Sequence, residues 1–110
     1  MAQRTHKEFN NEVKLAIDNA LYTILGQQVL KAVYESLRVH HGITSDEIPY
    51  RLDTLFKTLE STFGYQGAIT LGRVIAKRVY ARMGLQFREL PDYELQDYLD
   101  QAKKQLTLLP

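Results

Sequence analysis

FGYQGAITLGRVIAKRVYARMG, residues 63–84, is the stretch that decides the fold. Apolar residues recur in it at spacings of three and four, which predicts a helix from Ala68 to Met83. Its apolar face carries Ala68, Leu71, Gly72, Ile75, Val79 and Met83, and Ile69, Val74 and Tyr80 widen the apolar arc. An arc this wide predicts a central helix packed from several sides. Because Gly72 lowers helix propensity by about 1 kcal/mol relative to alanine, we expect a close helix crossing there.

Glycine and proline mark the other elements on both sides of this helix. Each of four glycines follows a segment with helical periodicity, as glycines at helix C-termini do: Gly26, Gly42, Gly64 and Gly84. The predicted helices span about 7–25, 27–40, 50–63, 68–83 and 92–106, with Ser45 capping a turn before Pro49, and Gly64–Gly67 forming a tight connection. No segment alternates at period two, so strands are not expected. The predicted fold is all-α, a compact bundle of four to five helices.

Length and composition indicate one folded domain. The 110 residues are 45% hydrophobic and 25% charged, which are ordinary globular values. We predict a single helical domain over residues 1–110, with residues 1–6 frayed and residues 86–110 forming a C-terminal acidic helix. The predicted core includes Ile17, Leu21, Leu30, Val33, Tyr34, Leu55, Phe56, Leu59, Ile75, Val79 and Leu99. No apolar run is long enough to cross a bilayer and the first residues are polar, so we expect no membrane partner and a cytoplasmic location.

Three sets of glycine and apolar residues carry a family resemblance. They are Gly26-Gln27-Gln28-Val29 with Val33, Tyr34 and Leu37; Gly42-Ile43 with Ile48-Pro49; and Phe63-Gly64-Tyr65-Gln66-Gly67-Ala68 with Val79-Tyr80 and Met83-Gly84-Leu85. On these residues the stretch 26–85 resembles a small all-helical family of archaeal and bacterial proteins, a signalling "output domain" of unknown function. The resemblance covers about half the chain and implies a regulatory or interaction role, without catalytic residues to carry over. The acidic segment after Leu85 departs from the family pattern or extends it.

A local charge switch identifies the candidate binding residues. The chain carries only +1 overall, yet every charged residue from Gly64 to Arg88 is basic and every one from Glu89 to Asp100 is acidic. The basic residues on the predicted central helix are Arg73, Lys77, Arg78 and Arg82. We predict that these four bind an anionic partner.

The same four residues allow other interpretations. If the last helix packs back antiparallel on the central one, they would pair with Asp92, Glu94, Asp97 and Asp100. A basic helix after a glycine turn also resembles a DNA-binding arrangement, although it lacks base-reading Asn or Gln residues. An exposed aromatic group, with Tyr93 and Phe87 as the candidate, could form a binding patch. Surplus apolar surface could instead be buried in a two-fold dimer. An apolar ligand between the helices stays a further alternative.

The search for catalytic and cofactor motifs yields none. There is no cysteine, and nucleophile, phosphate-loop and zinc-protease motifs are absent. His40 and His41 are adjacent, so on a helix they diverge by about 100° and cannot readily share one ion. We therefore expect no enzyme activity, no metal and no cofactor. The predicted function is a non-enzymatic regulatory or protein-interaction module acting through a helical surface, by a protein partner or self-association. The alternative is a nucleic-acid-binding domain that uses the basic helix.

Overall fold

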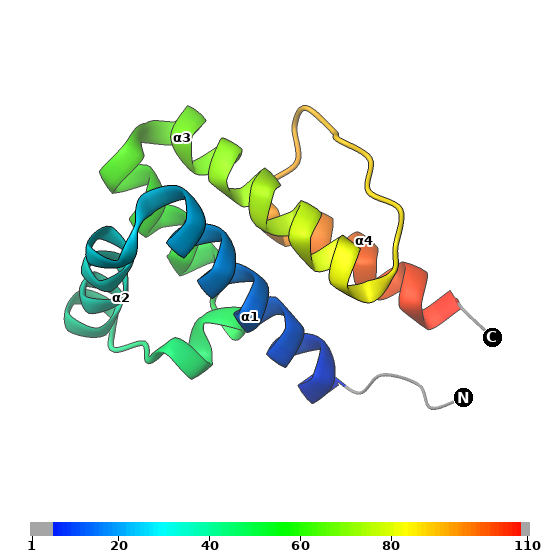
Figure 1. Ribbon diagram of the computed structural model, residues 1–110, viewed down its shortest axis with the longest axis horizontal. Coiled ribbons are helices and arrows are strands. Elements are labelled where there is room, and N and C mark those ends of the chain that lie inside the picture. The colour runs from blue at the N-terminus through cyan, green and yellow to red at the C-terminus, as the bar shows by residue number, and fades with distance from the viewer. Residues whose placement is uncertain (1–5, 109–110) are drawn as a thin grey trace.

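The computed structural model describes residues 6–108 of the chain. Four α-helices and one 3₁₀-helix make up this range: α1 (His6–Leu25), α2 (Gln27–His41), η1 (Ser45–Tyr50), α3 (Leu52–Met83) and α4 (Leu95–Leu108). Helix α3 runs through the middle, with α1 against one side and α4 against another, while α2 folds back beside α1 (Figure 1). Residues 6–108 contain no strand, so the predicted all-α bundle is confirmed. Residues 1–5 of the segment expected to fray lie outside the described range, and His6 is the first residue of α1.

Two single glycines turn the chain between helices. Gly26 (φ 84°, ψ 166°) separates α1 from α2, and Gly64 (φ 79°, ψ 169°) breaks α3 into a first segment, 52–63, and a second segment, 65–83. This backbone region is essentially closed to residues with a side chain. The predicted connection Gly64–Gly67 is thus one residue long, and helix resumes at Tyr65. Gly67 is still required, because a Cβ there would lie 2.8 Å from the Cβ of Phe63.

The chain between α2 and α3 differs from the prediction in its cap. Thr44, not Ser45, precedes η1, and its backbone N–H and its hydroxyl both donate to the Glu47 carboxylate, at 3.1 and 2.9 Å. Pro49 lies inside η1, where it is buried together with Ile48, and α3 begins only at Leu52. The backbone of Arg51 (φ −133°, ψ 50°) is non-helical and separates the two helices. The buried pair in η1 attaches this turn to α1 and α3.

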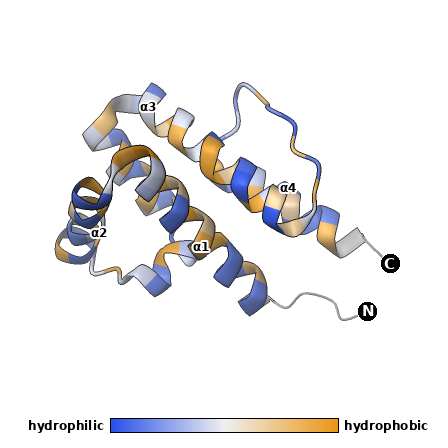
Figure 2. Cartoon of the chain, in the orientation of Figure 1, coloured by the Kyte–Doolittle hydropathy of each residue, from blue (hydrophilic) through white to orange (hydrophobic). Residues whose placement is uncertain are grey.

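The apolar core is built around α3, with residues from all four α-helices and from η1, and Figure 2 shows apolar residues recurring along each α-helix. Eight predicted core residues are buried: Ile17, Leu21, Val33, Leu55, Leu59, Ile75, Val79 and Leu99. The other three, Leu30, Tyr34 and Phe56, are half-buried and pack against the core from its edge. Ile24 lies three residues after the buried Leu21 but is 45% exposed, because α1 ends one residue later and the chain turns away at Gly26.

Helix α4 runs parallel to the second segment of α3, not antiparallel as the pairing interpretation requires. Residues 84–94, hereafter the 84–94 loop, return along α3 before α4 starts at Leu95 rather than Asp92 (Figure 1). The start of α4 therefore lies beside the middle of α3: a Cβ on Gly72 would be 3.4 Å from the Cβ of Leu95. One turn further along α4, the backbone carbonyl of Tyr98 meets the hydroxyl of Tyr80. A helix crossing at Gly72 is thus present, but a Cβ would make an ordinary van der Waals contact there, so the crossing does not require a glycine.

Candidate functional site

The four predicted binding residues do not form one open basic face. Arg78 donates a hydrogen bond to the side-chain carbonyl of Asn19, and Arg82 pairs with Glu12; both partners belong to α1. Arg73 pairs with Glu89 of the 84–94 loop, at 3.4 Å between Nη1 and Oε1. Lys77 is exposed and has no ion-pair partner among the described residues. Three of the four cations therefore already bind the chain itself.

The interpretation that these cations pair with the acidic helix is wrong. Within the described range, none of the four forms an ion pair with Asp92, Glu94, Asp97 or Asp100. Parallel packing explains this, because α4 turns its apolar residues toward α3 and leaves its acids on the outer side. Two of these acids bond locally instead: Asp97 accepts from the backbone N–H of Glu94, and Asp100 accepts from the amide of Gln96, both at 2.9 Å.

Four aromatic residues, Tyr80, Phe87, Tyr93 and Tyr98, form an aromatic cluster that holds the 84–94 loop. Ring centroids lie 5.3 Å apart for Tyr80–Phe87 and 5.1 Å apart for both Phe87–Tyr98 and Tyr93–Tyr98. The Tyr98 hydroxyl accepts from the backbone N–H of Leu90 at 2.9 Å and donates to its carbonyl at 3.0 Å. The patch predicted from Tyr93 and Phe87 is thus not exposed, because both rings pack half-buried into this cluster. Burial raises the pKa of Tyr80, and the nearby Tyr93 and Tyr98 add to the effect.

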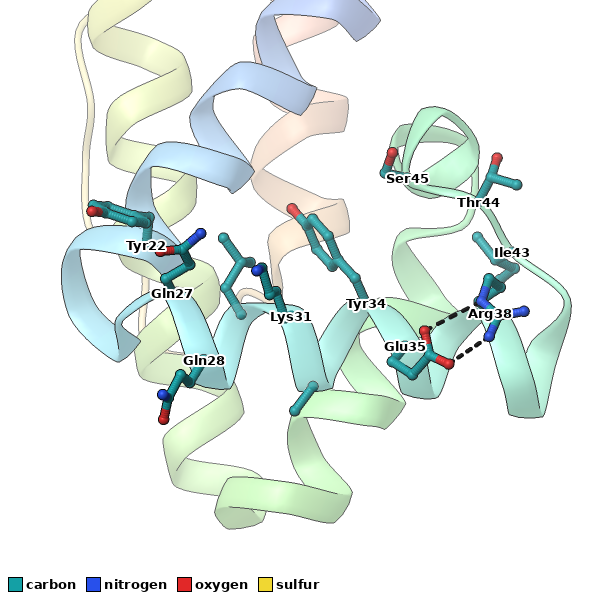
Figure 3. Close-up of a pocket in the computed structure, with 12 residues that line it drawn as sticks. Tyr22, Gln27, Gln28, Lys31, Tyr34, Glu35, Arg38, Ile43, Thr44 and Ser45 are labelled. Atoms are coloured by element: carbon teal, nitrogen blue, oxygen red, sulfur yellow. Dashed lines mark hydrogen bonds and ion pairs between the residues drawn. The ribbon is translucent and has the colours of Figure 1, made fainter.

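A groove of about 860 Å³ opens between the end of α1, α2 and the start of η1 (Figure 3). Its lining is contributed by Tyr22 of α1, by α2 between Gln27 and Arg38, and by residues 43–45. Leu30, Tyr34 and Ile43 are half-buried or buried and form its apolar floor. Tyr22, 56% exposed, stands at its rim. The groove combines apolar surface with side-chain amides, hydroxyls and charges.

A hydrogen-bond chain fixes the floor of this groove. The Tyr34 hydroxyl donates to Asp18 of α1, and Lys14 donates to the same carboxylate at 3.1 Å. Burial raises the pKa of Tyr34 well above its ordinary value, and the hydrogen bond to Asp18 and the charge of Asp18 add to this. The Tyr34 ring is therefore held neutral and in place between α1 and α2.

Lys31 supplies the net charge of the groove. Glu35 and Arg38 neutralise one another through two hydrogen bonds, shown as dashed lines in Figure 3. These bonds and the Arg38 charge lower the pKa of Glu35. Lys31 lines the groove, is exposed, and forms no ion pair with any described residue. The site therefore presents one uncompensated cation over an apolar floor.

Sequence reasoning missed this groove. The spacing of Leu30, Val33, Tyr34 and Leu37 gives α2 one apolar stripe, which predicts packing but no open surface. Ala32 is a further apolar residue of α2, and it is exposed and lines the groove. The exposed Val29 and Val39 do not line it, so apolar residues outside the stripe did not mark its position.

The two adjacent histidines and the remaining acidic residues are the side chains from which a metal site would be built. His40 and His41 are exposed in the last turn of α2. Across residues 6–108, no three His, Cys, Asp or Glu side chains gather in a way that could hold a metal ion. None of the helices in that range is both long and apolar enough to cross a membrane.

The chain matches no protein-family model, and it matches neither a curated protein nor a solved structure. The resemblance of residues 26–85 to the signalling output domain therefore stays a prediction. Any function must be inferred from the site itself.

Proposed function

We propose that this protein is a non-enzymatic regulatory or protein-interaction module that acts through the helical surface formed by α1, α2 and η1. The observation that carries the proposal is the groove, which leaves an apolar floor open beside an uncompensated lysine. Open apolar clefts flanked by polar groups are typical of binding sites. The output-domain resemblance agrees with this role, since most groove residues fall within the stretch 26–85.

The groove is a better candidate than the basic residues of α3. A ligand bound by Arg78 or Arg82 would compete with Asn19 and Glu12, which already hold these side chains against α1. A ligand at Arg73 would compete with Glu89 in the same way. Lys77 alone offers an exposed charge without such competition, and one cation is a weak basis for binding nucleic acid.

Site-directed photo-crosslinking in the native host tests this proposal. A benzophenone amino acid at Ala32, an exposed position in the groove, should give a discrete protein adduct that excess unlabelled protein suppresses. The same group at exposed Lys77 serves as the matched control and should give none. An adduct at Lys77 alone would move the interaction surface to α3.

Titration with short DNA and RNA separates the alternative function. NMR shifts confined to residues 73–82 that fade with added salt would favour nucleic-acid binding, because phosphate contacts weaken as salt rises. Under the proposal we expect no such shifts.

A further inference from the structure

We propose that the groove receives an acidic amphipathic helix, about three turns long, from a partner protein. This inference rests on the proposed function and names the class of partner. Partner helices that bind in grooves insert apolar anchors at spacings of three, four and seven residues. The floor formed by Leu30, Tyr34 and Ile43 is the apolar counterpart that such anchors require.

The length of the partner helix follows from the lining of α2. Lining residues extend along α2 from Gln27 to Arg38, which is eleven steps along the helix axis. At about 1.5 Å per residue this distance is about 16 Å, or about three turns of a helix lying alongside.

The charge of the partner follows from Lys31, which lies between the two ends of this lining. Because Glu35 is paired with Arg38, no nearby carboxylate on α2 neutralises Lys31. An Asp or Glu beside the apolar anchors would meet this charge, whereas a basic helix would be repelled.

A second copy of this chain is a poor source for such a helix. The acidic helix α4 exposes Gln96, Asp97 and Asp100, but its apolar residues are buried against α3. It therefore has acids without the free apolar anchors that the proposed partner helix must carry. The partner is accordingly a different chain.

A displayed library of helical peptides tests the inference on the full chain. The peptides carry apolar residues at i, i+4 and i+7, with all flanking positions randomised. Selected peptides should be enriched in Asp and Glu. Their affinity should fall about tenfold or more on Lys31→Glu, which corresponds to about 1.4 kcal/mol. Lys77→Glu is the matched charge control and should change affinity less than about twofold.

A second pair of variants tests the place of binding. Ala32→Arg fills the groove from an exposed helical position and should abolish binding of the selected peptides. Ala81→Arg adds the same side chain at an exposed position of α3 outside the groove and should leave binding intact. Circular dichroism of all four variants confirms that each is folded before binding is compared.

The outcomes separate this inference from the proposed function. Groove-dependent peptides with neutral or basic flanks would overturn the acidic partner while the interaction role stands. The crosslinking experiment could give an adduct at Ala32 while no selected peptide loses binding on Ala32→Arg. That combination would show that the partner is not a helix. A dimer in sedimentation that Ala32→Arg dissociates would make the occupant a second copy. Absence of both the adduct and the peptides would contradict the function as well.

Discussion

The second segment of α3 is covered on two sides, and the two sides are closed in different ways. On the α1 side, polar pairs at the edge join Arg78 to Asn19 and Arg82 to Glu12. On the α4 side, the aromatic cluster closes the edge and ties down the 84–94 loop. Exposed ion pairs contribute only about 0–1 kcal/mol each, whereas buried aromatic rings contribute several times more. The polar pairs at the α1 edge, which the charge pattern of the sequence makes conspicuous, are therefore expected to stabilise the fold less than the aromatic cluster.

The largest expected effect comes from removing the ring at the centre of the aromatic cluster. Tyr98 is 1% exposed, contacts two other rings and bonds both backbone groups of Leu90. Tyr98→Ala should lower the free energy of unfolding by about 3–5 kcal/mol, as measured by denaturant titration. Tyr22→Ala, at an exposed tyrosine, is the control and should change it by less than about 0.5 kcal/mol. A loss below about 1 kcal/mol for Tyr98→Ala would refute the comparison.

The helix crossing at Gly72 should show the next largest effect. A Cβ there makes an ordinary contact of 3.4 Å with Leu95, so Gly72→Ala fits and gains helix propensity. Gly72→Val adds two methyl groups directed at α4 and should cost about 1–3 kcal/mol through overpacking. Thermal unfolding measures both variants. If Gly72→Ala and Gly72→Val unfold at the same temperature, α4 is free to move away from α3.

A smaller effect should follow from removing only the hydroxyl of Tyr98. Tyr98→Phe keeps the ring contacts but leaves the Leu90 N–H and carbonyl without this partner, at a cost of about 1 kcal/mol. Hydrogen exchange should speed up at Leu90 and its neighbours in the 84–94 loop, while amides in α1 keep their rates. Unchanged exchange at Leu90 would show that the rings alone hold the loop.

The smallest effect is expected on the α1 side. A double-mutant cycle with Arg82→Ala and Glu12→Ala should give a coupling of about 0–1 kcal/mol. The coupling should shrink as salt rises toward about 1 M, since exposed charges are then screened. A coupling above about 2 kcal/mol that persists in salt would place this pair on a par with the aromatic cluster and remove the contrast.

The sequence predicted the elements of the fold better than its connections. Apolar spacing located the helices, and Gly26 and Gly64 marked the breaks because their backbone angles exclude other residues. The route of the 84–94 loop was not predictable in this way. Tyr98 bonds to Leu90 and packs on Phe87, and nothing in the spacing of these residues indicates that the loop turns back along α3.

The candidate site was the least predictable part. Charge patterning singled out four cations on α3, but charge alone does not reveal which partner is nearest in space. Arg78 and Arg82 bond to side chains of α1, which lie about 60–70 residues earlier in the chain. The groove, in turn, joins residues of α1, α2 and η1 that form no common motif.

The sequence by itself determined an all-α chain, the positions of its helices and most of its core. These properties depend on periodicity and on backbone angles, which a few neighbouring residues set. Only the tertiary structure decided the direction of α4, the partners of the charged residues and the groove beside Lys31. Each of these depends on distances between segments far apart in the chain, and the packing of the whole bundle sets those distances.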